Sequence, residues 1–235
     1  MAEGLGRTER RRLDQDGAVM VRPDLDLAAL ASALAPADQD FGAGRRFFHA
    51  PEPLKPLLAP FGPLGAIAAS ALSPAARPTR MIVFDKTEAK NWAVAWHQDR
   101  TIAVAARAPV QGYDIWSKKD GVDHVEPPFD VIARTFSLRL HLDDAGPDNA
   151  PLLTVRGSHT LGKLPADAAG DYAATGKVDT HCARAGDLLV VRTAVLHASH
   201  RARAPRRRRV LHLDFCDADL PAPLQWAFAW EGAHA

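Results

Sequence analysis

Three histidines in the sequence are each followed two residues later by an aspartate, and both residue types are strong metal ligands. The three pairs are His97/Asp99, His141/Asp143 and His212/Asp214. Residues i and i+2 of a β-strand point to the same face, so any of these pairs could offer both side chains to one ion. Two histidines and one carboxylate on one face of an octahedron leave three positions free, an arrangement that suits non-heme Fe(II).

The position of each pair along the chain favours one of them. The stretch GDLLVVRTAVLHASH, residues 186–200, supplies a tight turn, an apolar strand and then His197 as the third ligand. Between the His97 pair and His197 there is room for about four strands, enough to close a barrel. The His141 pair leaves few strands before His197, and almost no chain follows the His212 pair. The spacing therefore favours His97, Asp99 and His197.

A second histidine close to His197 is the obvious rival as the third ligand. His200 lies three residues beyond His197, so it faces the opposite side of a strand and is expected in the following loop.

An iron site of this type usually works with an acidic cosubstrate, whose far carboxylate needs a fixed cation such as arginine. The last predicted strand, RRVLHLDF, begins with Arg208. Alternation gives this strand an apolar face with Leu211, Leu213 and Phe215 and an opposite face with Arg208, Val210, His212 and Asp214. Arg209 shares the face of the leucines and would have to reach outward. The pattern favours Arg208 as the cation, although the choice between Arg208 and Arg209 stays open.

Short strand-like runs separated by turn residues begin at residue 80. They are RMIVF, WAVAWHQD, TIAVAAR, FSLRLHLDD, PLLTVRG, DLLVVR, AVLHASH and RRVLHLDF. This spacing, with few long helical patterns between the runs, indicates a β-sandwich or barrel.

The chain before residue 80 has a different pattern, with helical segments and loops in place of short strands. Residues 7–15 read as a charged helix, GAVMV as a strand and DLDLAALASALA as a helix that begins at aspartates. Residues 41–79 read as loops with short helices near 54–58 and 66–72. We expect a single domain over 1–235, with a helical N-terminal cap and loops at 1–79, a β core at 80–216 and an apolar tail at 217–235 that packs on the core.

Composition excludes several classes of protein. The 235 residues carry a net charge of only +1, so there is no electrostatic case for nucleic acid or an anionic membrane, despite the clusters Arg10–Arg12 and Arg206–Arg209. Two cysteines make no disulfide framework, and no apolar stretch has the length of a signal or a membrane span. We expect a cytoplasmic protein with a small-molecule substrate; its oligomeric state stays open.

Together these motifs resemble the phytanoyl-CoA dioxygenase family of Fe(II)/2-oxoglutarate-dependent oxygenases. The resemblance covers residues 80–216 and rests on WHQD, HLDDAGPDNAPLLTVRGSH, GDLLVVR, LHAS and the last strand with its leading arginine. It implies a mainly β, cupin-like double-stranded β-helix (jelly roll). It also implies that His97, Asp99 and His197 bind Fe(II), and that Arg208 and Ser199 bind 2-oxoglutarate.

The resemblance further implies the reaction. A dioxygenase of this family uses O2 to hydroxylate a C–H bond of a small organic molecule, while 2-oxoglutarate is converted to succinate and CO2. Asp99 favours hydroxylation, because related halogenases lack this carboxylate. The competing hypothesis is a non-catalytic jelly-roll module that binds a metal or a ligand.

Four further residues are candidates for the substrate pocket. Arg139 and His141 alternate with leucines, so they should point into the barrel, where they either contact substrate or are satisfied by polar neighbours. Trp116 and His124 belong to the loop 111–130, which we expect at the mouth of the barrel as a lid; a solvated hairpin is the alternative. The sequence does not identify the substrate or the oxidised position.

Overall fold

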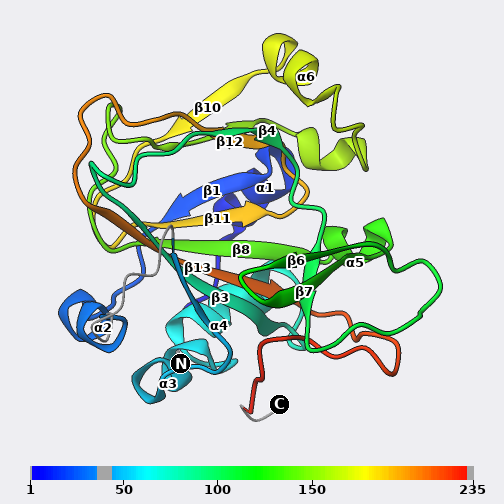
Figure 1. The fold of residues 1–235 in the computed structure, drawn as a ribbon. Helices are drawn as coiled ribbons and strands as arrows, with labels where there is room; N and C mark the ends of the chain where they lie inside the picture. Colours follow the sequence, from blue (N-terminus) through cyan, green and yellow to red (C-terminus); the bar gives the residue numbers. More distant parts are fainter. Residues whose placement is uncertain (1, 36–43, 232–235) are drawn as a thin grey trace.

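Two antiparallel β-sheets form the centre of the computed structural model, which describes residues 2–35 and 44–231 (Figure 1). The larger sheet has the order β1-β11-β8-β13-β3-β2. Its strands are β1 (Ala18–Val21), β2 (Gly44–Phe47), β3 (Arg77–Lys86), β8 (Thr135–His141), β11 (Leu188–Arg192) and β13 (Arg208–Cys216). The smaller sheet has the order β10-β9-β12-β4 and consists of β4 (Val94–His97), β9 (Leu152–Val155), β10 (Val178–His181) and β12 (His197–Ser199).

The chain crosses repeatedly between these two sheets. Strand β3 lies in the larger sheet, β4 in the smaller, β8 in the larger, β9 and β10 in the smaller, β11 in the larger, β12 in the smaller and β13 in the larger. This path is that of a jelly roll. The predicted fold class is therefore confirmed, and the stretch between the two candidate metal-binding histidines contains the core strands that the spacing required.

Alternation along the strands of the larger sheet separates a core face from a polar face. Leu211, Leu213 and Phe215 of β13 are fully buried in the main hydrophobic cluster, together with Leu138 and Leu140 of β8. The opposite faces of the same strands carry the polar side chains that the pattern predicted. The larger sheet therefore buries its leucines on one side and presents charged groups to the smaller sheet on the other.

The N-terminal helices cover the leucine face of the larger sheet (Figure 1). They are α1 (Arg7–Asp16), α2 (Leu27–Ala33), η1 (Glu52–Leu54), α3 (Lys55–Leu58) and α4 (Pro63–Ala71). Leu13, Leu30 and Leu64 bring helical side chains into the same hydrophobic cluster as the sheet. Asp26 caps α2 by accepting a hydrogen bond from the backbone N–H of Ala29, as its position before the apolar run predicted. The part of the predicted 41–79 loop region at 41–43 lies outside the described residues.

The segment 111–130 differs from the predicted loop. It contains β6 (Asp114–Lys119) and β7 (Val122–Glu126), which form a hairpin and pair with β5 (Ile102–Val104) in a separate sheet of order β5-β7-β6. Helix α5 (Phe129–Ala133) follows directly. The segment is therefore the hairpin given as the alternative, and the preferred reading as a loop is wrong. Strand β6 is mostly exposed and lacks the apolar alternation that marks a strand. Another predicted strand, TIAVAAR, shortens to β5 and joins this hairpin instead of the jelly roll.

The C-terminal tail lies against two parts of the molecule. Phe228 is buried in the main cluster, and Leu224 is buried beside β5 in a second cluster. Trp226 forms an isolated bridge with Val104. The remaining short helices, η2 (Ser158–Leu161) and α6 (Ala169–Thr175), lie between β9 and β10 in the chain. Within the described residues, no helix combines the length and apolarity needed to cross a bilayer.

His124 on β7 makes the stability of the hairpin sheet sensitive to acid. Its side chain is fully buried, its Nδ1 donates to the carbonyl of Val122 at 3.0 Å, and its Nε2 has no partner. Burial lowers the pKa of His124 to about 4, whereas an unfolded histidine has a pKa near 6.5. Between pH 6.5 and pH 4 the unfolded chain therefore binds a proton that the folded chain does not, so stability falls with pH in that window.

We expect the substitution His124→Asn to reduce this acid sensitivity. The difference in free energy of unfolding between pH 7 and pH 5, from urea titrations, should be smaller by roughly 2 kcal/mol in the variant than in the wild type. An unchanged difference between the two pH values would show that His124 is not the buried neutral histidine described here.

Candidate metal centre

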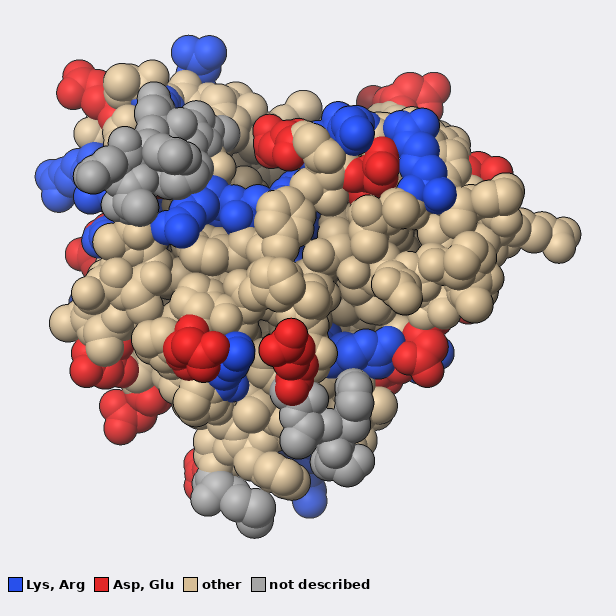
Figure 2. Space-filling model, turned by 60° about the horizontal axis from the view of Figure 1, so that its bottom comes forward, with Lys and Arg blue, Asp and Glu red and all other residues tan. Residues whose placement is uncertain are grey.

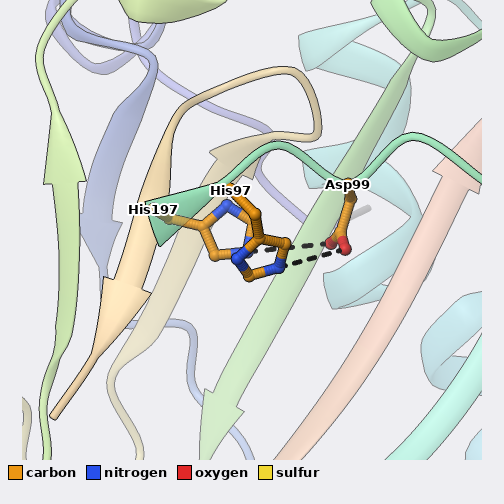
Figure 3. A group of neighbouring side chains, drawn as sticks. All are labelled: His97, Asp99 and His197. Atoms are coloured by element: carbon orange, nitrogen blue, oxygen red, sulfur yellow. Dashed lines mark ion pairs between the residues drawn. The ribbon is translucent and has the colours of Figure 1, made fainter. Parts of the chain in front are cut away.

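Three ligand-type side chains meet where the two sheets face each other (Figure 3). His97 ends β4 and His197 begins β12, and the register pairs these two residues directly across neighbouring strands. Asp99 follows His97 by two residues. The Nε2 of His97 lies 3.7 Å from Oδ1 of Asp99, and the Nε2 of His197 lies 3.9 Å from Oδ2 of the same carboxylate. One ion with ligand bonds of about 2 Å can span these separations.

Backbone carbonyls fix which nitrogen each imidazole presents. The Nδ1 of His97 lies 2.8 Å from the carbonyl oxygen of Ala95, and the Nδ1 of His197 lies 2.9 Å from that of Val195. A carbonyl oxygen only accepts, so each Nδ1 carries the proton and each Nε2 keeps its lone pair. Both lone pairs are therefore directed to the space beside Asp99, as metal ligation requires.

The protonation states also fit a metal ion. Burial lowers the pKa of His197 to about 3, so this imidazole is neutral at neutral pH. Burial alone would raise the pKa of Asp99, but the neighbouring His97 and the charges of His197 and Arg80 hold it well below the usual value. Burial alone would lower the pKa of His97, but its contact with Asp99 raises it above the usual value, so a proton on its Nε2 would leave when a metal ion binds. His197 and Asp99 are already in the form that ligates a metal.

Gln98, between the two ligands in sequence, faces away from them. Its Nε2 donates to the carbonyls of Ala194 at 2.7 Å and Gly162 at 3.0 Å, and its Oε1 accepts from the backbone N–H of Leu164 at 2.9 Å. The side chain is buried. Gln98 therefore connects the strand that carries the ligands to two loops behind it.

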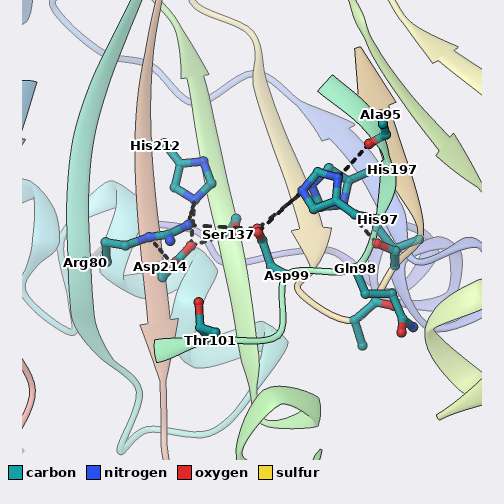
Figure 4. Close-up of polar contacts among 12 residues, drawn as sticks. Arg80, Ala95, His97, Gln98, Asp99, Thr101, Ser137, His197, His212 and Asp214 are labelled. Atoms are coloured by element: carbon teal, nitrogen blue, oxygen red, sulfur yellow. Dashed lines mark hydrogen bonds and ion pairs between the residues drawn. The ribbon is translucent and has the colours of Figure 1, made fainter. Parts of the chain in front are cut away.

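A buried ion pair supports Asp99 from the larger sheet (Figure 4). The Nε of Arg80 on β3 lies 2.6 Å from Oδ2 of Asp214 on β13, and an Nη of Arg80 lies 3.9 Å from Asp99. Asp214 also accepts a hydrogen bond from Ser137 at 2.7 Å and contacts His212 at 2.7 Å. Arg80 is therefore held by one carboxylate while its charge acts on the other, which keeps Asp99 ionised.

We expect the substitution Arg80→Met to weaken Fe(II) binding by about 10- to 100-fold, because Asp99 loses its neighbouring cation and Asp214 loses its partner. Competition with a coloured Fe(II) chelator would measure the change. Arg77→Gln is the matched control, since Arg77 lies on the same strand but pairs with Asp219. Equal Fe(II) affinity in both variants would contradict the role given to Arg80.

A cavity of about 190 Å³ adjoins the three ligands. Its apolar walls come from Phe84, Trp92, Val94, Leu152, Ala198 and Val210, and its polar lining comes from Arg80, Lys86, His97, Asp99, Arg139, His141, His197, Ser199, Arg208 and His212. The three ligand-type side chains and four basic side chains therefore surround one space.

One end of this cavity holds cations without a carboxylate partner. Arg208 is buried, and its Nε has no hydrogen-bond partner. Lys86 lies opposite Arg208 in the register; its Nζ donates to the carbonyl of Trp92 at 2.7 Å and to Oγ of Ser199 at 3.4 Å. Burial and then Arg208 lower the pKa of Lys86 to about 8, and burial and then Arg139 lower that of Arg208 to about 10. An anion bound here would offset the burial of these charges.

The neighbouring arginine has a different environment. Arg209 donates from its Nε and Nη2 to Asp143 at 2.8 Å, and it does not line the cavity. The strand parity read from the sequence therefore holds for both arginines, and the structure places Arg208 at the cavity.

The four candidate substrate residues separate into two groups. Arg139 and His141 line the cavity. Trp116 packs in the hydrophobic cluster of the hairpin sheet, where Arg107 lies over its ring, and His124 is buried within that sheet. Neither of these two lines the cavity. Arg80, Lys86 and Phe84 also line the cavity and were not predicted as site residues. They reach the cavity because β3 lies beside β13, a pairing that the sequence does not indicate.

Comparison with known proteins agrees with this geometry. The jelly roll and its two-histidine, one-carboxylate centre define the class of non-heme iron oxygenases. The model of the phytanoyl-CoA dioxygenase (PhyH) family matches residues 13–210, and the chain belongs to this family of Fe(II)/2-oxoglutarate-dependent oxygenases, as the motifs predicted. No curated protein matches the sequence.

Solved structures share the fold over nearly the whole chain. AviO1 from Streptomyces viridochromogenes Tue57 is 24% identical with a TM-score of 0.63, over 95% of this chain and 100% of that one. EctD from S. alaskensis, with 2-oxoglutarate and 5-hydroxyectoine, is 16% identical with a TM-score of 0.68, over 99% and 86%. HygX from Streptomyces hygroscopicus, with nickel and 2-oxoglutarate, is 18% identical with a TM-score of 0.62, over 91% and 87%.

Proposed function

We propose that this protein is a dioxygenase that hydroxylates a C–H bond of a small organic molecule and converts 2-oxoglutarate to succinate and CO2. The observation that supports it best is one cavity that joins the His97, Asp99 and His197 centre to the unpaired Arg208. A dianion that chelates the metal at one end and needs a cation at the other matches both features. The EctD and HygX structures, with 2-oxoglutarate bound to the same fold, support the proposal.

The residues of this chain divide the work in the proposed reaction. Bound iron would supply a site for the 2-oxo acid and for the activation of O2. His97, His197 and Asp99 hold that iron, and Arg80 keeps Asp99 ionised. Arg208, with Lys86 and Ser199 beside it, binds the far carboxylate of 2-oxoglutarate and so fixes its orientation.

The other walls of the cavity control access. Phe84, Trp92, Val94 and Leu152 line it with apolar surface, which limits the water that can reach the reacting groups. Asp99 would be the third protein ligand of the iron, which leaves no protein position for a halide. We therefore assign hydroxylation as the outcome of the reaction.

The test begins with wild-type protein under argon. Addition of Fe(II) and 2-oxoglutarate should produce a metal-to-ligand charge-transfer band in the visible, and admission of O2 should then release succinate, faster with a substrate from a metabolite panel. Identification of the product by mass spectrometry decides hydroxylation, because that reaction adds one oxygen atom. Absence of both the band and succinate would favour the non-catalytic binding module instead.

A further inference from the structure

The cavity contains a second arginine that the proposed reaction does not use. Arg139 on β8 lines the cavity, and its Nε is buried without a hydrogen-bond partner. Among the described residues it forms no hydrogen bond and no ion pair at 4.0 Å or less, whereas Arg80 pairs with Asp214 and Arg209 pairs with Asp143. Removing an arginine side chain from water without a partner is costly, so an unpaired cation in a cavity points to an anionic ligand.

When the charges that line the cavity are paired with one another and with those of 2-oxoglutarate, Arg139 has no negative partner. Four basic side chains and one acidic side chain line the cavity. Asp214 neutralises Arg80, and Asp99 faces the metal. In the proposed reaction one carboxylate of 2-oxoglutarate binds at the metal. The other binds at the end of the cavity that holds Arg208 and Lys86. The positive charge of Arg139 then has no counterpart within the cavity.

Polar atoms next to Arg139 are also without partners. Arg139 lies opposite His212 in the register of β8 and β13, and His141 follows it on the same face of β8. The Nδ1 atoms of His141 and His212 are both buried and lack hydrogen-bond partners. Burial lowers the pKa of His141 to about 4 and also lowers that of His212, so both rings are neutral and carry one N–H each. The N–H of His212 is at Nε2 and donates to Asp214, so only His141 can donate from its Nδ1 to a ligand.

We propose that the organic substrate carries a carboxylate, which Arg139 binds while Nδ1 of His141 donates a hydrogen bond beside it. This inference rests on the proposed function, because it requires that Arg208 is occupied by 2-oxoglutarate. It places the substrate on the β8 side of the cavity, between the metal and the strands of the larger sheet. Neutral molecules of the same shape would leave the guanidinium buried and unpaired, so the cavity selects acids.

The test uses wild-type protein loaded with Fe(II) and 2-oxoglutarate under argon. The probes are small carboxylic acids and their matched carboxamides, for example benzoate with benzamide and hexanoate with hexanamide. Binding is read as a shift of the charge-transfer band and a rise in melting temperature. We expect acids to bind and their amides not to bind, and we expect Arg139→Gln to weaken acid binding by about 10- to 100-fold while the affinity for 2-oxoglutarate stays unchanged.

Two outcomes would overturn the inference while leaving the proposed function intact. In the first, the band forms but no acid binds better than its amide. In the second, Arg139→Gln weakens the binding of 2-oxoglutarate as strongly as Arg208→Gln does. That result would mean that Arg139 binds the near carboxylate of the cosubstrate. Absence of the band in wild-type protein would instead reject the proposed function, and the inference with it. Arg139→Lys keeps the charge and should retain part of the acid binding; if Arg139→Gln does not fold, the acid and amide comparison in wild-type protein decides.

Discussion

The substitution His197→Ala is expected to remove the Fe(II)- and 2-oxoglutarate-dependent charge-transfer band and to lower succinate formation by about 10³-fold or more. His197 is nearly fully buried, its Nε2 faces Asp99, and its Nδ1 is occupied by the carbonyl of Val195. A water molecule in the space of the imidazole is a weaker ligand and is not held in place by the backbone. Anaerobic titration followed by visible spectroscopy measures the band, and coupled detection of succinate measures the turnover.

The matched control is His200→Ala, because His200 is exposed and belongs to the same segment. This variant should keep the band and the rate of succinate formation. Loss of the band in His200→Ala, or its persistence in His197→Ala, would show that the metal does not bind where the three side chains converge.

The substitution Arg208→Gln is expected to weaken the binding of 2-oxoglutarate by about 10²-fold or more, because two charge-assisted hydrogen bonds to one carboxylate are lost together. Arg208 is the buried guanidinium at the far end of the cavity, and Gln is too short and uncharged to replace it. Titration of the charge-transfer band with 2-oxoglutarate gives the dissociation constant. Fe(II) affinity should stay close to that of the wild type, because no metal ligand changes.

The adjacent residue supplies the control for this prediction. Arg209→Gln removes an equal charge from the same strand but breaks only the ion pair with Asp143 outside the cavity. Its 2-oxoglutarate affinity should match that of the wild type. If Arg209→Gln weakens the binding of 2-oxoglutarate and Arg208→Gln does not, Arg209 and not Arg208 faces the cosubstrate.

The parts of the site that follow a local rule could be predicted from the sequence. Alternation predicted His97 and Asp99 on one side and separated Arg208 from Arg209, and both relations hold in the structure, although Asp99 lies just beyond the end of β4. The leucines of β13 are buried and its polar residues face the cavity for the same reason. These predictions need only the period of two residues, which every strand imposes.

Elements with little apolar surface could not be predicted. Strand β6 is exposed along most of its length, and β10 has no buried residue, so neither shows the alternation of a half-buried strand. Both depend on backbone hydrogen bonds to a neighbouring strand. Helix α6 was also missed: it is as short as α2, but it begins after Ala168, which offers no capping side chain like that of Asp26.

Contacts between distant segments were equally invisible. Arg80 and Asp214 are 134 residues apart, so nothing near either residue indicates that they form an ion pair. Lys86 reaches the cavity only because β3 continues beyond the predicted run RMIVF and lies beside β13. Such pairs become apparent only when the strand order is known.

Because His97 and His197 are paired across neighbouring strands, a metal ion bound by both would connect β4 to β12. Strand β4 is at the edge of the smaller sheet and is only four residues long, so few ladder hydrogen bonds hold it to β12. An ion bound by one histidine from each strand is a crosslink between them, and it binds the folded chain in preference to the unfolded one. By mass action the folded state would then gain free energy with the logarithm of free metal concentration, so iron supply would affect the resistance of this edge to local opening as well as the rate of the proposed reaction.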